Sequence, residues 1–274
     1  MNNVTSQPRR VCARHGDVAV HLRGDARNPA VVMSHSILSS SAMWDEQAAL
    51  LAREGWYAVC IDTTGHGNSP APTTRTVTMD GLAADMVAVL DALDIARAHY
   101  VGLSLGGMIG FGLGIHHRVR LLSLMLCDSR ADAPPVVAAP WDERIAIAEQ
   151  HGSCAPLAAP TIERWFGKAF VEKNPNVASR LHDVAAATTV KGFVGCARAI
   201  QGLDYLAGVA GITVPTTLIV GANDGVLPDA MRDLQQRIGA DAVLETIPDA
   251  GHLPNIDQPA AFNAALLRHL RRVQ

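Results

Sequence analysis

A serine, an aspartate and a histidine occupy places in the sequence from which they could together perform nucleophilic chemistry. Ser104 lies in Gly102-Leu-Ser-Leu-Gly106, between a short β-favouring run and an apolar segment of helical length. A G-x-S-x-G pattern in this setting predicts a sharp strand-to-helix turn, a nucleophile elbow, that presents the hydroxyl at the positive end of a helix. A serine hydroxyl needs a nearby base, and the base needs a carboxylate to orient it. Ser104 is therefore the candidate nucleophile.

The base and its acid are expected on loops that follow later strands. Among eleven histidines, His252 is the one between the last predicted strand and the last predicted helix. Two aspartates compete as the acid: Asp224 follows the apolar run 218–221, and Asp128 follows the run 124–127, one strand earlier. Both satisfy the chain order Ser, Asp, His. We favour Asp224, because loops after the later strand usually carry the acid, and we expect Asp128 to cap a helix or turn.

An oxyanion hole requires two backbone N–H groups directed at the developing negative charge. Leu105, directly after the serine, is expected to supply one. The loop after Met33 is expected to supply the second, from Ile37 or, as the alternative, from Ser36. Two further histidines, His35 and His66, lie in loops near the same edge of the sheet, and we interpret both as structural residues that hold loop backbone.

Strand-like and helix-like segments alternate over most of the chain, which predicts an α/β fold with a mostly parallel, twisted sheet and helices on both faces. The expected strands cover 11–14, 18–23, 30–33, 56–61, 99–101, 121–127, 216–220 and 242–247, and expected helices include 42–54, 79–93, 229–238 and 258–272. The alternation breaks after Asp128, where no convincing strand occurs before about Gly211. We interpret this stretch as a helical insertion.

The predicted organisation is a disordered tail over residues 1–10, a core made of 11–133 and 212–274, and a helical lid insertion over 134–211. The insertion is rich in aromatic residues, which could line an apolar substrate pocket. Trp141, Trp165 and Phe166 are the candidates there for substrate binding; the plainer interpretation of each is a place in the insertion's own core. Seven basic and seven acidic residues between positions 141 and 205 give no argument for an anionic substrate.

Composition excludes several classes of partner. The chain has 274 residues, of which 49% are hydrophobic and 18% charged, with a formal net charge of -3 and no basic stripe, so no nucleic acid is expected. No apolar run is long enough to span a bilayer, so no membrane partner is expected. Five cysteines without a C-x-x-C pair suggest a reducing, cytoplasmic location. No clustered metal-ligand spacing occurs, so we expect no metal and no cofactor; the oligomeric state stays open.

Four motifs together resemble α/β-hydrolases of the lid-bearing type: Gly-Leu-Ser104-Leu-Gly-Gly, Asp62-x-x-Gly-His-Gly-Asn-Ser69, Gly221-Ala-Asn-Asp224 and Gly251-His252. Within that superfamily the chain is most similar to 3-oxoadipate enol-lactonases, through 34–39 with Met43-Trp44, and through 141–145, 164–166 and 192–200. The resemblance implies a serine triad, no cofactor and the opening of a lactone. It adds Trp44 to the candidate substrate-binding residues.

Two departures from the enol-lactonase pattern bear on the substrate. His35-Ser-Ile-Leu38 stands where that family usually has Asn-Ser-Leu-Gly, and Thr64 replaces an arginine. The first alters the acyl pocket, and the second removes a cation near the site. We therefore expect a cofactor-independent serine hydrolase acting on a small ester or lactone. The alternatives are a C–C bond hydrolase or lyase on the same triad, and a non-catalytic binding protein on the hydrolase scaffold.

Overall fold

The core of the molecule is a twisted eight-stranded sheet, seen in a computed structural model that describes residues 7–239 and 241–273. The strand order is β1-β2-β4-β3-β5-β6-β7-β8. The pairs β1·β2 and β2·β4 are antiparallel, and all neighbours from β4 through β8 are parallel. The strands are β1 (Arg9–Ala13), β2 (Gly16–Arg23), β3 (Ala30–Ser34), β4 (Tyr57–Asp62), β5 (Ala98–Leu103), β6 (Leu121–Cys127), β7 (Thr216–Gly221) and β8 (Val243–Ile247).

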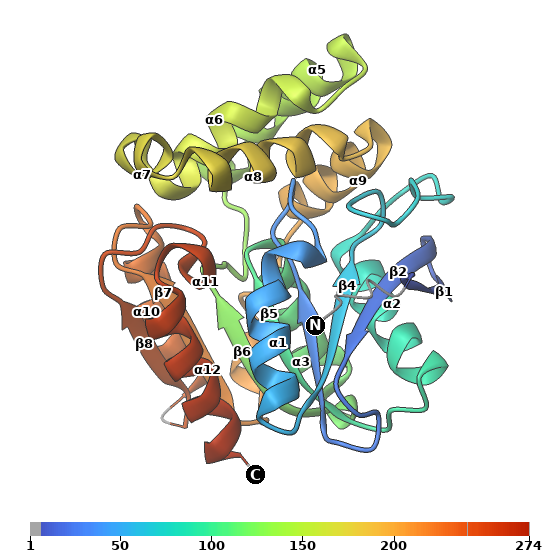
Figure 1. The fold of residues 1–274 in the computed structure, drawn as a ribbon, viewed down its shortest axis with the longest axis vertical. Helices are drawn as coiled ribbons and strands as arrows, with labels where there is room; N and C mark the ends of the chain where they lie inside the picture. Colours follow the sequence, from blue (N-terminus) through green and yellow to red (C-terminus); the bar gives the residue numbers. More distant parts are fainter. Residues whose placement is uncertain (1–6, 240, 274) are drawn as a thin grey trace.

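Helices cover both faces of this sheet. Figure 1 shows α1 (Asp45–Arg53) and α12 (Pro259–Arg272) in front of the sheet, with α2 (Met79–Ala92) and α3 (Leu105–His116) behind it. The other core helices are the short η1 (Ser41–Trp44), η2 (Arg118–Arg120), η3 (Val209–Gly211) and α11 (Pro254–Asp257), together with α10 (Leu227–Ile238). The predicted α/β architecture is confirmed.

Local sequence explains where these elements begin. Every residue of β3, β4, β5 and β7 is buried, as expected for strands covered on both faces. Thr78 caps α2 by accepting a hydrogen bond from the Gly81 N–H. The predicted tail over 1–10 is wrong at its C-terminal end, because Arg9 and Arg10 pair with Val20 and Ala19 in the sheet; its residues 1–6 lie outside the described residues.

A block of helices between β6 and β7 lies across the carboxyl edge of the sheet (Figure 1). It comprises α4 (Pro135–Ala138), α5 (Pro140–His151), α6 (Ala155–Phe166), α7 (Lys168–Lys173), α8 (Pro175–Ala187) and α9 (Val190–Gln201). We call this block the helical insertion. Backbone hydrogen bonds join it to core loops, from Thr189 N to Gly65 O at 2.9 Å and from His252 N to Trp165 O at 2.8 Å.

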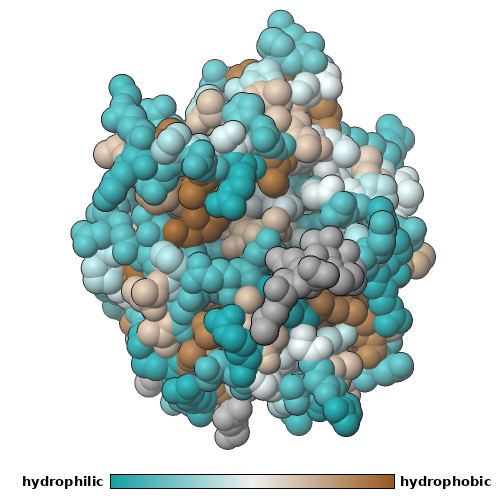
Figure 2. All heavy atoms as spheres, viewed as in Figure 1, coloured by the Kyte–Doolittle hydropathy of each residue, from teal (hydrophilic) through white to brown (hydrophobic). Residues whose placement is uncertain are grey.

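A hollow of 630 Å³ lies between the helical insertion and the core. Met43 from η1 and Leu181 from α8 are among the side chains that line it. The space-filling view shows hydrophobic residues gathered between the insertion and the core on this face (Figure 2). No helix in the described part of the chain combines the length and apolar character needed to cross a bilayer.

We predict that Gly102→Ala destabilises the fold, because a Cβ at this position would collide with the backbone carbonyl of Gly106 on α3. The expected loss in the free energy of unfolding is at least about 2 kcal/mol, the scale of overpacking in a rigid backbone contact. Gly211→Ala is the matched control, because a methyl group there would meet no heavy atom of the described chain within 4 Å apart from its chain neighbours and its own helical turn. Urea denaturation of both variants measures the difference; equal stability of the two would contradict the steric argument.

Candidate active site

Ser104 occupies the turn between β5 and α3 in a backbone conformation that side chains rarely adopt. Its φ is 57° and its ψ is -113°, and its N–H donates to the Cys127 carbonyl at 2.9 Å. The turn is tight because a Cβ at Gly106 would collide with the backbone of Ser34 at the end of β3. The hydroxyl is thereby placed at the N-terminus of α3, where the helix dipole favours negative charge.

The structure brings His252 and Asp224 to this hydroxyl. His252 Nε2 lies 3.0 Å from Ser104 Oγ, and His252 Nδ1 lies 2.7 Å from Asp224 Oδ2. Since a carboxylate accepts, Nδ1 carries the proton and Nε2 is free to accept the serine proton. Burial alone would raise the pKa of Asp224, but the charge of His252 and its hydrogen bond hold that pKa below its usual value. The arrangement can therefore activate the serine hydroxyl.

Contacts from several elements fix the loop that carries His252. Its backbone N–H donates to Trp165 O at the end of α6, and the Gly251 N–H donates to Asp257 Oδ2 at 2.7 Å. Asn255 Nδ2 donates to Met43 O at 2.8 Å, which joins α11 to η1. The sequence pattern did not indicate α11 or these contacts, because the partners are more than 80 residues apart or supplied by backbone.

The two candidate oxyanion donors lie on segments that touch. The Gly106 N–H donates to His35 O at 3.1 Å, so the loop after β3 contacts the first turn of α3. Ile37 and Leu105 are both buried. Among the described turns, loops and helix caps, no backbone carbonyl accepts a hydrogen bond from either N–H. Both amides therefore remain free for a ligand oxygen, which is what an oxyanion hole needs.

His35 and His66 hold loop backbone, and their rings lie 5.3 Å apart. His35 Nε2 accepts the Thr63 N–H at 2.9 Å while its Nδ1 donates to Ser36 O at 2.7 Å. His66 Nδ1 donates to Thr64 O at 3.0 Å, and burial with the nearby His35 lowers the pKa of His66 to about 3. Both rings are therefore neutral near pH 7, which agrees with a structural role.

Asp62, at the end of β4, begins one of the four motifs named above, and it positions two loops, a role that the sequence analysis did not predict. Its Oδ1 accepts the Ser41 N–H at 2.7 Å and its Oδ2 accepts the Asn68 N–H at 2.8 Å. His21 Nε2 lies 3.1 Å from Oδ2. Burial alone would raise the pKa of Asp62, but the hydrogen bonds from His21, Asn68 and Ser41 lower it to about 2. One carboxylate thus joins the loop after β3 to the loop after β4.

The four candidate substrate-binding aromatics lie in different surroundings. Trp44 is fully buried and packs on Phe262 of α12, with ring centroids 5.9 Å apart. Trp141 packs on Phe193 within the insertion. Trp165 touches the site directly, because its carbonyl accepts the His252 N–H. Phe166, which lines a hollow of 280 Å³ beside Asn223, stacks on Phe170. Their role in substrate binding stays a prediction.

Asp128 lies beside Asp224 without contacting the histidine through a hydrogen bond. Its Oδ1 accepts the Gly221 N–H of β7 at 2.8 Å, so it bridges two strand ends instead of capping a helix or turn as expected. Polar atoms of Asp128, Asp224 and His252 lie within 4.8 Å of one another, a spacing that a metal ion could use. However, both nitrogens of His252 already face other partners, so a metal could bind there only by displacing one.

The chain is similar to known α/β-hydrolases over most of its length. The profile of the alpha/beta hydrolase fold matches residues 29–259, so the chain belongs to the α/β-hydrolase family. Two relatives come from Acinetobacter baylyi. 3-Oxoadipate enol-lactonase 1 is 34% identical, with 89% of this chain and 90% of that protein covered. 3-Oxoadipate enol-lactonase 2 is 30% identical, with 93% of this chain and 94% of that protein covered. The crystal structure of the enol-lactonase from Burkholderia xenovorans matches with a TM-score of 0.88 and 30% identity, covering 96% of this chain and 100% of that one. The resemblance read from the sequence motifs is confirmed.

We predict that Asp62→Asn lowers the free energy of unfolding by about 2 kcal/mol at pH 7, the stabilisation that corresponds to a pKa lowered from 3.8 to about 2. A carboxyl with a lowered folded-state pKa stabilises the protein above its unfolded pKa, and this contribution is lost as the pH falls toward about 2. The gap between wild type and variant should therefore narrow below about pH 4.

Urea titrations at pH 7, 4 and 3 measure this gap. Asp229→Asn is the control, because the Asp229 side chain is 87% exposed and its charge should contribute little. A gap of the same size at pH 7 and pH 3 would show that the Asp62 charge does not stabilise the fold.

Proposed function

We propose that the chain is a cofactor-independent serine hydrolase that cleaves a small carboxylic ester or lactone through an acyl-enzyme. The observation that carries the proposal is the continuous hydrogen-bonded series from Ser104 Oγ through His252 to Asp224, with separations of 3.0 and 2.7 Å. Nucleophile, base and orienting acid within hydrogen-bond reach are the arrangement that activates a serine hydroxyl.

In the first half-reaction, Ser104 Oγ attacks the substrate carbonyl carbon while its proton moves to His252 Nε2. The Leu105 and Ile37 N–H groups stabilise the oxyanion that forms, and Asp224 stabilises the imidazolium. Collapse of this intermediate breaks the carbon–oxygen bond, and His252 gives its proton to the departing oxygen. In a lactone the departing oxygen stays attached to the acyl chain, so the ring opens on the enzyme.

In the second half-reaction, water attacks the acyl carbon of Ser104 while His252 again accepts a proton. The second tetrahedral intermediate collapses, Ser104 recovers its proton from His252, and the carboxylic acid leaves. Every proton in this cycle moves through one imidazole, which needs no redox group. The helical insertion, as a lid, would cover this chemistry through the contact between Trp165 and the His252 loop.

The proposed substrate class rests on the relatives and on one departure from the enol-lactonase pattern. Both Acinetobacter baylyi relatives are 3-oxoadipate enol-lactonases by name, and they match nearly the whole chain. Thr64 stands where the enol-lactonase pattern usually has an arginine, so we propose a small lactone or ester as the substrate class, and an enol-lactone is the specific member to test. Trp141, Trp165, Phe166 and Trp44 are the proposed substrate-binding residues.

Ser104→Ala should lower kcat/KM by at least about 10⁴-fold, because the variant lacks the nucleophile. A fluorophosphonate probe should label one serine in the wild type and none in this variant. Ser179→Ala is the matched control, since Ser179 is exposed on α8, and it should keep full labelling and activity. Near-complete activity or labelling in Ser104→Ala would defeat the assignment.

A substrate panel separates this function from the other chemistries that a serine triad can support. We expect turnover of enol-lactones, aliphatic lactones or small aromatic esters, ranked by kcat/KM, because the departing oxygen can take its proton from His252. Cleavage of a vinylogous diketone or a cyanohydrin should be undetectable. Efficient turnover of either of these with negligible ester or lactone hydrolysis would instead assign C–C hydrolysis or a lyase reaction.

A further inference from the structure

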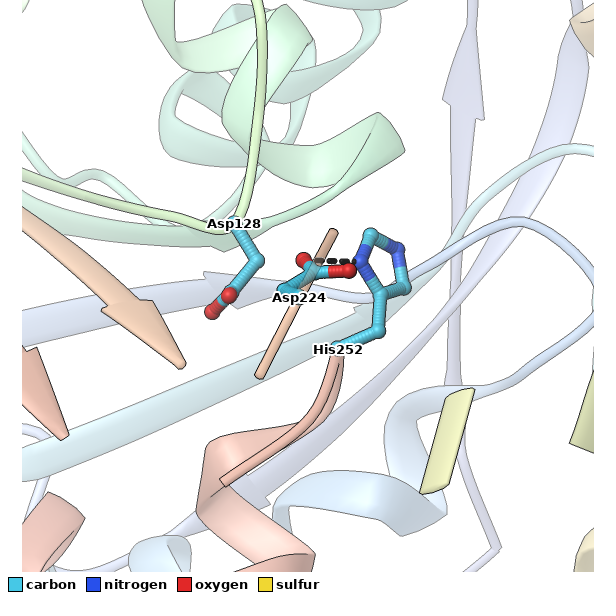
Figure 3. A group of neighbouring side chains, drawn as sticks. All are labelled: Asp128, Asp224 and His252. Carbon is cyan, nitrogen blue, oxygen red and sulfur yellow. Dashed lines mark hydrogen bonds and ion pairs between the residues drawn. The ribbon is translucent and has the colours of Figure 1, made fainter. Parts of the chain in front are cut away.

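Two carboxyl groups lie side by side behind the imidazole, and only one of them touches it. Asp224 follows β7 and faces His252, while Asp128 follows β6 and lies on the side of Asp224 away from the imidazole (Figure 3). Asp128 is 1% exposed, and its Oδ1 accepts the Gly221 N–H. Its Oδ2 is buried and receives no hydrogen bond from the described residues. A buried carboxylate oxygen without a donor is costly, and this cost requires an explanation.

The charges around the pair favour one proton between the two groups. Asp224 has His252 as its partner, and the charge of Arg164 on α6 also favours its ionised form. Among the described residues, the Gly221 N–H is the one group that donates a hydrogen bond to the Asp128 carboxylate. The neighbouring Cys127 thiol is neutral because burial raises its pKa. Burial and the charge of Asp224 raise the pKa of Asp128 well above its usual value. Adjacent buried carboxyls cannot both ionise at low cost.

The backbone holds Asp128 in this place. Its φ is 44°, a left-handed conformation that aspartate tolerates but rarely adopts, and its N–H donates to Ile219 O at 2.9 Å. Strain of this kind persists where surrounding contacts dictate it. One carboxylate oxygen of Asp128 lies within 4.8 Å of a carboxylate oxygen of Asp224, so the two groups are close enough to share a proton after a small rotation of either side chain.

We propose that Asp128 is a positioning residue that keeps its proton while Asp224 is ionised, and that its Oδ2–H donates to the Asp224 carboxylate. The inference rests on the proposed function, since it assigns how Asp224 is oriented for His252. The hydrogen bond fixes the rotation of the Asp224 carboxylate and withdraws part of its charge, which lowers the basicity of His252. Asp128 acts only through Asp224 and makes no contact with the reacting atoms.

Infrared spectroscopy tests the proton directly and does not depend on activity. The C=O stretch of a protonated carboxylic acid should be present at pH 8 in the wild type and in Ser104→Ala, and absent in Asp128→Asn. Asp229→Asn, which removes an exposed carboxyl, should leave the band unchanged. The same band in Asp128→Asn, or no band in the wild type, overturns the proposal whether or not the protein proves to be a serine hydrolase.

The pH profile of kcat/KM tests the coupling to His252. Asp128→Asn retains an acceptor for Gly221 and an N–H for Asp224, so its kcat/KM should stay within about threefold, whereas Asp128→Ala should lose about tenfold. The acidic limb of this profile, which reports the pKa of His252, should stay at the same pH in Asp128→Asn. In Asp128→Ala it should move to higher pH, because the full charge of Asp224 then raises the pKa of His252.

Each other outcome overturns the proposal. An acidic limb that moves to lower pH in Asp128→Asn means that the wild-type Asp128 is charged. A lower kcat/KM in Asp128→Ala without movement of the limb means that Asp128 serves packing alone. Stoichiometric divalent metal in the purified wild type, lost in Asp128→Asn, would assign the three groups to a metal site. If Asp128→Ala fails to fold, the proposal is tested by the position of the acidic limb in Asp128→Asn and by the carboxylic acid C=O band in the wild type.

Discussion

The turn between β5 and α3 holds Ser104 at a φ of 57°, and every other group of the site must meet the serine hydroxyl where this turn places it. Gly102 and Gly106 permit this turn, because each packs against backbone with no room for a side chain. Fully buried strands and the apolar α3 hold the turn from both sides and offset the strain of its conformation. The turn thus fixes the position of the Ser104 hydroxyl, and His252 and Asp224 must be brought to it by other parts of the chain.

The partners reach it because the carboxyl ends of parallel strands share one edge of the sheet. Hydrogen bonds then tie the loops together: Asp62 joins the loops after β3 and β4, and Gly106 joins the elbow to the loop after β3. The helical insertion contacts the site through the Trp165 carbonyl, which accepts the His252 backbone N–H. Buried, neutral histidines at this edge serve the scaffold, and one histidine is left to face the serine.

The sequence predicted the strands well where their runs are apolar and short, and β6 over Leu121–Cys127 matches residue for residue. Chain order and motif placed Ser104, Asp224 and His252, which lie within hydrogen-bond reach. Asp128 and Asp224 both follow strands and both fit the chain order, so the sequence offered no physical measure that separates them. Only the folded structure shows which carboxylate lies within hydrogen-bond distance of His252. The short α11, the pairing of Arg9 and the contacts of Asp62 depend on tertiary packing, which has no local pattern.

The use of Ser104 as the nucleophile is best tested by a crystal structure of the protein bound covalently to a boronate or phosphonate that imitates the tetrahedral intermediate. We expect a bond to Ser104 Oγ, with the anionic oxygen of the adduct within hydrogen-bond distance of both the Leu105 and Ile37 N–H groups. His252 Nε2 should lie beside the position of the leaving group. An adduct on another residue, or an anionic oxygen directed away from those two amides, would contradict it.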